Sequence, residues 1–390
     1  MYFKVTSLPA RVGGLFASHF FGFGLFLPFF PMVLENRGLG LAEIGYILSA
    51  GTIVRIAANP VMTGLSDHSG RRRLSIFVYS VLGAMFLGVF AGTSGFWAAL
   101  IAVAGLMAFW SPVVPLSDAY ALDVVRNHGA DYGRMRLWGS VAFVVANVFG
   151  GWFAGDDNSV LLIIGGMVFG VMATGGVALT LPGQKTSDAA AVSEDDVKPD
   201  LFARGWFWLI LIVLGLLQGS HAAFYGFGTL FWLQAQISEF QVGLLWSVGV
   251  VAEIGLFFIA GRLSPRFGPL NLLLIAAAFG VVRWGLFPYA DNFAMAAGLQ
   301  LLHGLSFGAA HLGAVGYLAG LVPQKWAATG QGCLAASNGI LTALGFAVCG
   351  PLFDLEPAFA FWAMAALSAI ASVSLMLLRP FMVARLAEAQ

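Results

Sequence analysis

The sequence predicts an all-α membrane protein whose twelve transmembrane helices form two pseudo-symmetric bundles of six helices. Three observations support this fold class: the composition, the number of long apolar runs and an internal repeat. Of the 390 residues, 59% are hydrophobic and only 10% are charged, whereas a soluble globular chain carries about 25% charged residues. This composition excludes a water-soluble fold. The formal net charge is zero, so no overall charge would attract nucleic acid.

Each predicted helix rests on an apolar run of nearly the length that a membrane requires. A bilayer core about 30 Å thick takes roughly 20 helical residues, and a helix satisfies its own backbone hydrogen bonds there. The fifth run is short, so we expect that helix to extend into the neighbouring loops. In chain order the runs cover residues 12–34, 42–63, 74–92, 97–124, 137–154, 159–181, 206–234, 240–260, 270–288, 293–322, 328–350 and 357–378.

The chain start and the charges between the runs predict the orientation. Residues 1–11 lead directly into the first run without a small-residue cleavage pattern, so we expect no removable signal. An even number of helices places both termini on one side. Of the 19 Lys and Arg residues, only Arg37, Arg55 and Arg283 fall outside the segments on that side. Because cytoplasmic loops are rich in Lys and Arg, we predict an inner-membrane protein with both termini in the cytoplasm.

A polar segment divides the helices into two halves. Residues 182–204 are small, acidic and polar and predict a cytoplasmic linker between a bundle at 1–181 and a second bundle at 205–390. Residues 45–51 align with 243–249, and the same shift brings Gly70 onto Gly268. Ser18-His19 matches Ser220-His221 at a slightly different offset. Duplicated six-helix halves are typical of secondary transporters, which bind substrate between the halves and expose it to each side in turn.

The loop after the second helix resembles the signature of the major facilitator superfamily, Gly-x-Leu-Ala-Asp-Arg-x-Gly-Arg-Arg. Here it reads Thr63-Gly64-Leu65-Ser66-Asp67-His68-Ser69-Gly70-Arg71-Arg72-Arg73 and departs from the pattern at Thr63 and His68. In the second half Pro265 takes the acidic position, so the resemblance implies that only the first copy holds a closed state through acidic–basic pairs. We expect Asp123 to pair with Arg126, Arg134 or Arg136 and to have at most a gating role. We assign gating to Asp67, Arg71, Arg72, Asp131, Arg134 and Arg136.

Five further segments resemble the 3-phenylpropionate transporter family, which is similar to the branch of the lactose permease and the nucleoside–proton symporters. The resemblance covers nearly the whole chain and implies the fold of the major facilitator superfamily and transport of a small organic solute. The segments are residues 111–119, 131–143, 217–227, 245–253 and 280–285.

Four charged residues stand out within the predicted membrane helices: Arg55, Asp118, Glu253 and Arg283. A charge near the bilayer centre costs at least about 2.5–3.5 kcal/mol on insertion scales, so such residues usually line a pathway or meet a partner. Glu253 lies near mid-depth, where movement of a neighbouring arginine would change its affinity for a proton. The alternative is that the four charges form fixed buried pairs, or, for Asp118, that it serves helix packing.

The resemblance also implies the residues that couple transport to protons. The lactose permease branch uses a Glu in the eighth helix, an Arg in the ninth and a His in the tenth, which correspond here to Glu253, Arg283 and either His303 or His311. The tenth helix here has no carboxylate, in contrast to the lactose permease, so Glu253 or a histidine must take that part. A buried histidine that only satisfies a hydrogen bond is the alternative. We assign proton coupling to Glu253, Asp118, His303 and His311.

Aromatic side chains lie close in sequence to the polar positions within the membrane. Together with an arginine they suit an amphipathic anion, because its ring stacks on rings and its carboxylate meets a guanidinium. Packing or lipid contact is the alternative for each aromatic residue, and amide side chains would equally suit sugar or nucleoside hydroxyls. We assign substrate binding to Arg283, Arg55, His19, Phe23, Gln218, His221, Tyr225, Trp284 and Asn338.

The sequence therefore predicts a proton-coupled symporter for a small organic solute, foremost an aromatic carboxylate such as 3-phenylpropionate. The alternatives are a sugar or nucleoside symporter and a drug–proton antiporter. Antiporters of this superfamily usually carry Gly-Pro in the fifth helix, and residues 137–154 contain no proline. An enzyme is not expected, because no GxxxxGK[ST] or HExxH sequence occurs. We expect no metal or other cofactor, and as partners the substrate, protons and lipid, with no nucleic acid and a monomeric chain.

Overall fold

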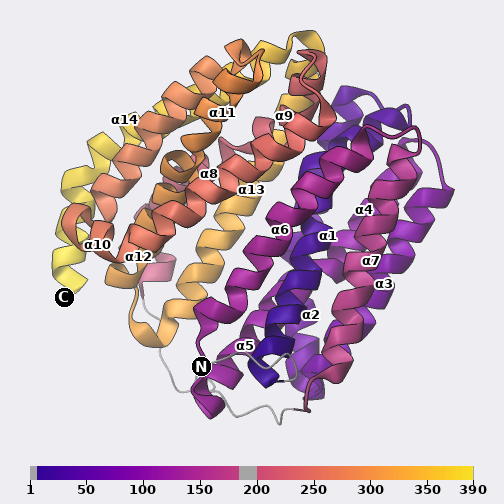
Figure 1. Cartoon of the computed structure of the whole chain (residues 1–390). Coiled ribbons are helices and arrows are strands. Elements are labelled where there is room, and N and C mark those ends of the chain that lie inside the picture. Colours follow the sequence, from indigo (N-terminus) through magenta and orange to yellow (C-terminus); the bar gives the residue numbers. More distant parts are fainter. Residues whose placement is uncertain (1–6, 184–199, 390) are drawn as a thin grey trace. The chain divides into compact units, whose positions relative to one another are not determined.

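The computed structural model describes residues 7–183 and 200–389, and every regular element in these ranges is a helix (Figure 1). The chain groups into two compact units, which are described separately. The predicted linker, 182–204, lies largely outside the described residues. The first unit holds α1 (Leu8–Asn36), α2 (Leu41–Ser69), α3 (Arg72–Gly92), α4 (Phe96–Trp110), α5 (Val113–His128), α6 (Tyr132–Ala154) and α7 (Ser159–Thr180), together with residues 238–247.

The second unit contains the remaining helices and the rest of α10. Short helical turns connect several of its longer elements. In chain order these are η1 (Asp200–Ala203), α8 (Gly205–Gly219), α9 (Ala222–Gln234), α10 (Glu239–Leu286), η2 (Phe287–Tyr289), α11 (Phe293–Leu301), η3 (Gly304–Gly308), α12 (Ala309–Leu321), η4 (Gln324–Trp326), α13 (Ala327–Leu355) and α14 (Pro357–Ala389).

The number of membrane-length helices agrees approximately with the twelve predicted spans. Among the described residues, 11 helical segments are long and apolar enough to cross a membrane. One of them, Glu239–Tyr289, has 51 residues and contains the eighth and ninth predicted runs. It kinks at Gly268, whose φ of 71° and ψ of 163° are not helical. This segment is long enough for two crossings, which accounts for the difference.

Two glycines in matching positions of the repeat adopt backbone angles that favour glycine. Gly70 ends α2 with a φ of 62°, and Gly268 interrupts α10 with a φ of 71°. The left-handed region is open to glycine because it has no Cβ that would clash with the backbone. The structure thus gives a physical reason for the glycine at this point of both halves.

Three predicted spans are not continuous α-helices. The fourth is interrupted at Ser111–Pro112, between α4 and α5, where proline has no backbone N–H to donate. The seventh is interrupted at Ser220–His221, between α8 and α9. The tenth contains a π-helical turn, η3, and such turns often occur at functional sites. These interruptions bring polar side chains into an apolar bundle.

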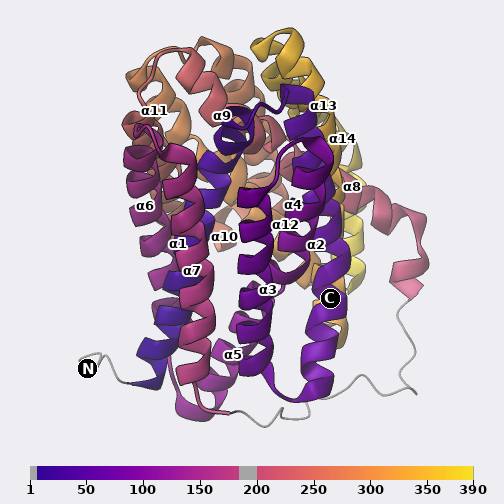
Figure 2. The ribbon, with the colours of Figure 1, turned by 90° about the vertical axis from the view of Figure 1, so that its right-hand side faces the viewer.

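Within the first unit, α1 packs most extensively against α6 and α7, and Figures 1 and 2 both place these helices side by side. Small residues allow the close approach. A Cβ added at Gly24 would lie 2.7 Å from the carbonyl oxygen of Phe143, and one at Gly170 would lie 2.6 Å from the nitrogen of Gly22. Such contacts between small residues are the usual way in which helices associate in a membrane.

Candidate functional site

Arg283 in α10 is the centre of a polar cluster inside the second unit. Its side chain is fully buried. Nη1 donates to Nδ1 of His303 at 2.9 Å and to Oγ of Ser306 at 3.1 Å, and Nη2 donates to Oε1 of Gln300 at 2.5 Å. The guanidinium carbon lies 4.4 Å from the ring centre of Trp284, a cation–π contact. Neutral acceptors and an aromatic face therefore hold this cation.

The bond from Arg283 fixes the protonation state of His303. Arginine is always charged and can only donate, so Nδ1 of His303 must accept. His303 is therefore neutral and carries its proton on Nε2. Nε2 lies 3.8 Å from Oε2 of Glu253, which is beyond hydrogen-bond distance. We refer to Glu253, Arg283, Gln300, His303 and Ser306 as the Arg283 cluster.

A shell of rings surrounds this cluster. His221, at the break between α8 and α9, is 1% exposed, and its ring centre lies 5.7 Å from that of His303 and 5.1 Å from that of Trp284. The Nδ1 atom of His221 lies 3.1 Å from the carbonyl oxygen of Leu217, whereas its Nε2 has no partner within the described residues. The ring of Tyr225 lies 6.5 Å from that of His303.

Three other predicted residues of the second unit, His311, Gln218 and Asn338, make no hydrogen bond to Arg283 in the described part of the chain. Phe307 separates His311 from His303, with its ring stacked 5.1 Å from His303 and 6.5 Å from His311. Gln218 is half-buried near the end of α8, and its backbone carbonyl accepts a bond from the nitrogen of His221. Asn338 in α13 is half-buried, and its Oδ1 has no partner in the described part of the chain.

The first unit contains a second aromatic cluster, around His19 in α1. His19 is 5% exposed, with its ring 5.3 Å from that of Phe20 and 5.5 Å from that of Trp110. The ring of Phe23 lies 6.0 Å from Trp110. The guanidinium carbon of Arg136 lies 3.9 Å from the ring centre of Phe20, and Arg136 makes no ion pair within residues 7–183 and 200–389. The structure thus places Arg136, for which we predict gating, beside aromatic rings.

Asp118 and Arg55, the two ionisable residues singled out within spans of the first unit, make no hydrogen bond or ion pair with His19 or Arg136 in the described residues. Asp118 in α5 accepts a hydrogen bond of 2.9 Å from the hydroxyl of Tyr132. Arg55 in α2 is half-buried and has no hydrogen bond or ion pair with any residue that the structure describes.

Acidic and basic side chains pair where α2, α3 and α5 meet. The carboxylate of Asp123 accepts from Nη1 of Arg72 at 2.6 Å and from Nη2 of Arg126 at 2.5 Å. Nη2 of Arg72 donates to Oδ1 of Asp67 at 3.2 Å. Asp67 and Arg72 come together as the signature loop implies, and Asp123 joins them. Arg126 completes the network as one of the three partners expected for Asp123, because a spacing of three residues on a helix brings the two side chains together.

The other predicted gating residues lie apart from this network. Arg71 is exposed at the start of α3. Asp131 caps α6, since its Oδ1 accepts from the backbone nitrogen of Arg134 at 3.1 Å, and the two side chains form an exposed ion pair of 3.5 Å. Sequence reasoning also missed Gln300 and Ser306. They lie three residues before and after His303, on the helix face that His303 shares.

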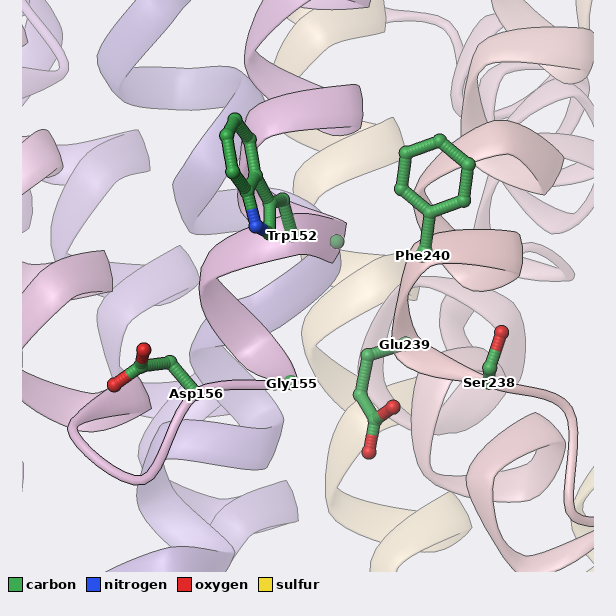
Figure 3. A pocket seen from close by; sticks show the side chains of 7 residues that line it. Trp152, Gly155, Asp156, Ser238, Glu239 and Phe240 are labelled. Atoms are coloured by element: carbon green, nitrogen blue, oxygen red, sulfur yellow. The ribbon is translucent and has the colours of Figure 1, made fainter.

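A shallow pocket of about 220 Å³ lies at the end of α6 and the start of α10 (Figure 3). None of the predicted site residues lines it, so the pocket is not the candidate site. Its lining consists of Gly151, Trp152, Gly155, Asp156, Ser238, Glu239 and Phe240.

Comparison with known proteins extends the resemblance seen in the sequence. The family model described as MFS_1 like family matches residues 14–364. The chain is 34% identical over 313 residues to the Probable 3-phenylpropionic acid transporter of Escherichia coli (strain K12), which covers 77% of this chain and 80% of that protein. It is 28% identical over 324 residues to the maltose permease of Geobacillus stearothermophilus, with 82% of each covered.

The fold has close counterparts among solved structures. The crystal structure of the nucleoside transporter NupG matches with a TM-score of 0.82 and 17% identity, covering 95% of this chain and 98% of that chain. The D-xylose-proton symporter matches with a TM-score of 0.69. The family match, the relatives and the fold all agree with the resemblance seen in the sequence. The chain belongs to the MFS_1 like family, which consists of membrane transporters of the major facilitator superfamily and not of enzymes.

Proposed function

We propose that this protein takes up a small aromatic carboxylate together with a proton. The observation that carries the proposal is the series formed by the half-buried Glu253 and the buried His303 and Arg283, in which a carboxylate, an imidazole and a guanidinium follow one another. The similarity to a 3-phenylpropionic acid transporter supports the substrate class. We also propose, from the distribution of Lys and Arg, that both termini lie in the cytoplasm.

The hydrogen bonds link anion binding to proton binding. Nδ1 of His303 cannot take a proton while Arg283 donates to it. Nε of Arg283 is buried and has no partner among the described residues, so it can donate to a carboxylate once the side chains over it move. An anion at Nε competes for Arg283 and weakens its hold on Nδ1, so His303 binds a proton more readily when the substrate is present.

Aromatic side chains beside the guanidinium suit the rest of the substrate. The guanidinium carbon of Arg283 lies 5.0 Å from the ring centre of Phe224 and 4.4 Å from that of Trp284. A phenyl ring gains from stacking on such rings, whereas its carboxylate needs the cation. Because Arg283 is fully buried, the side chains over it must move to admit the substrate.

The decisive test is the substitution Glu253→Gln in purified protein reconstituted into vesicles. We expect proton-driven accumulation of 3-phenylpropionate to fall to passive equilibration, because glutamine cannot take up and release the proton. Exchange of labelled for unlabelled substrate should persist, since exchange requires no net proton movement. The measurement is substrate uptake with and without an imposed pH gradient.

Glu356→Gln is the matched control, because Glu356 is an exposed carboxylate at the end of α13. We expect this variant to accumulate substrate as the unchanged protein does. Undiminished uphill accumulation by the Glu253→Gln variant would remove Glu253 from proton coupling.

A sugar is the second candidate substrate. The maltose permease similarity covers 82% of each chain, and Oδ1 of Asn338, which has no partner among the described residues, is an acceptor suited to a hydroxyl group. The same vesicles, tested with maltose and with a nucleoside, separate the substrate classes. Uptake of maltose without uptake of 3-phenylpropionate would favour this second candidate.

A further inference from the structure

The Arg283 cluster is held together by a close seam between α10 and the tenth span. Along this seam, residues 300, 304 and 308 of the tenth span face residues 249, 252 and 256 of α10. A Cβ added at Gly249 would lie 3.2 Å from Nε2 of Gln300 and 3.7 Å from Cβ of His303. The seam therefore sets how closely Gln300 and His303 approach α10, which also carries Glu253 and Arg283.

Gly304 is the tightest backbone contact of this seam. A Cβ added there would lie 2.8 Å from the carbonyl oxygen of Ala252 and 3.6 Å from the backbone nitrogen of Glu253. Carbon atoms essentially never approach so closely, and a helix carbonyl cannot turn away as a side chain can. At Gly308 the added Cβ would instead meet the tip of Leu256 at 2.7 Å, and that flexible side chain can move.

The same residue begins the π-helical turn. His303 directly precedes η3, and Ser306 lies within it, so both partners of Nη1 of Arg283 stand at this turn. A π-turn has a wider backbone than an α-helix and changes the direction in which following side chains point. The backbone approach at Gly304 thus coincides with the turn that aims His303 and Ser306 at Arg283.

We propose that Gly304 is the positioning residue of the Arg283 cluster: its missing side chain lets the tenth span touch the backbone of α10 and so holds His303 between Glu253 and Arg283. This inference rests on the proposed proton coupling for its functional consequence. Its structural part, the placement of His303, stands apart from the identity of the substrate. Helices in membranes commonly approach through glycines, and here the approach has a specific geometric result.

The test is Gly304→Ala, with Gly298→Ala as the matched control on the same span. Gly298 is exposed, and an added Cβ there meets nothing within 4 Å. In Gly304→Ala we expect proton-driven accumulation to fall by about tenfold to a hundredfold, because a misplacement of about 1 Å at a reacting centre has costs of this size. The pH profile of uptake should change shape, whereas exchange should be retained. Gly298→Ala should match the unchanged protein in all three.

A spectroscopic measurement distinguishes a misplaced His303 from a general loss of structure in Gly304→Ala. With ¹⁵N-labelled histidine, the nitrogen shifts of His303, identified by their absence in His303→Asn, should show a neutral ring protonated on Nε2. Gly304→Ala should lose this pattern and Gly298→Ala should keep it. A folded Gly304→Ala protein with an unchanged His303 spectrum and pH profile would overturn the inference.

Two further outcomes are decisive. If Gly304→Ala does not fold, Gly249→Ala is the second variant, because it adds a Cβ at a less tight contact of the same seam. The His303 spectrum of Gly249→Ala then decides the inference by the same criterion. If Glu253→Gln still accumulates substrate uphill, the proposed function fails. The histidine spectra of Gly304→Ala and Gly298→Ala nevertheless support or overturn the positioning role.

Discussion

His303 faces Arg283 with one ring nitrogen and Glu253 with the other, and this arrangement requires a neutral ring. Its Nδ1 accepts from Arg283, and its Nε2 faces Glu253 across 3.8 Å. Protonation at Nδ1 would require Arg283 to leave, and movement of Arg283 would free Nδ1 for a proton. The affinity of His303 for a proton at Nδ1 therefore depends on where the guanidinium of Arg283 lies.

A pair of substitutions at His303 separates its two nitrogens. His303→Ala removes an acceptor from a buried cation, so we expect the protein to lose about 1–3 kcal/mol of stability. His303→Asn should recover most of this loss, because the amide oxygen stands near the position of Nδ1. Both variants should lose proton-driven accumulation, since neither offers a ring nitrogen to Glu253. Thermal unfolding in detergent and vesicle uptake measure the two effects.

Equal stability of His303→Ala and the unchanged protein would show that the bond from Arg283 to Nδ1 contributes little to the fold. The seam with α10 would then be the main source of order at this site.

At the scale of the element, the junction of α2, α3 and α5 depends on Asp123. The carboxylate joins Arg72 and Arg126, and its side chain is only 11% exposed. Removing one partner of an ion pair that is shielded from water costs more than breaking an exposed pair, because it leaves the other charge uncompensated. The network ties the loop after α2 to the end of α5.

Asp123→Asn tests this junction. We expect a loss of about 1–3 kcal/mol, because asparagine offers one neutral oxygen to two cations. Backbone hydrogen exchange over residues 67–73 and 123–128 should become faster. Asp131→Asn, in an exposed pair of 3.5 Å, is the control and should change exchange only near the start of α6. Unchanged hydrogen exchange in residues 67–73 after Asp123→Asn would show that Asp123 does not hold the loop after α2 to the end of α5.

The elements also show what the sequence could and could not predict. Length and hydropathy located the apolar runs, because a membrane sets both. They could not separate α8 from α9 or reveal the π-turn of η3, since an apolar run looks the same whether its backbone is regular or interrupted. The repeat did align Gly70 with Gly268, and both adopt a positive φ.

The candidate site divides in the same way. Glu253, Arg283 and His303 could be singled out because ionisable groups are rare in apolar helices, and the structure brings them together. Gln300 and Ser306 could not be ranked above the other polar residues, because their importance depends on a single neighbour, Arg283. The gating assignment treats Arg72 and Arg136 alike, whereas Arg72 pairs with Asp123 and Arg136 lies over the ring of Phe20, contacts that come from different helices.

At the scale of the whole molecule, the repeat and the charges within the spans belong together. The four charged residues that stand out within spans are two acids and two bases: Arg55, Asp118, Glu253 and Arg283. One acid and one base fall in each half of the sequence. When all four are ionised they add no net charge to either half, which lowers the cost of placing them in the apolar region.

The Arg283 cluster combines one permanent cation with one acid that the proposal loads with a proton. A proton and a monovalent anion add no net charge, so one turnover should be electroneutral. A membrane potential does work of about 2.3 kcal/mol per elementary charge for each 100 mV, or about fiftyfold in accumulation. We expect a potassium diffusion potential set by valinomycin to leave uptake unchanged, whereas a pH gradient drives it. Stimulation by the potential alone would show that a second proton crosses with each anion.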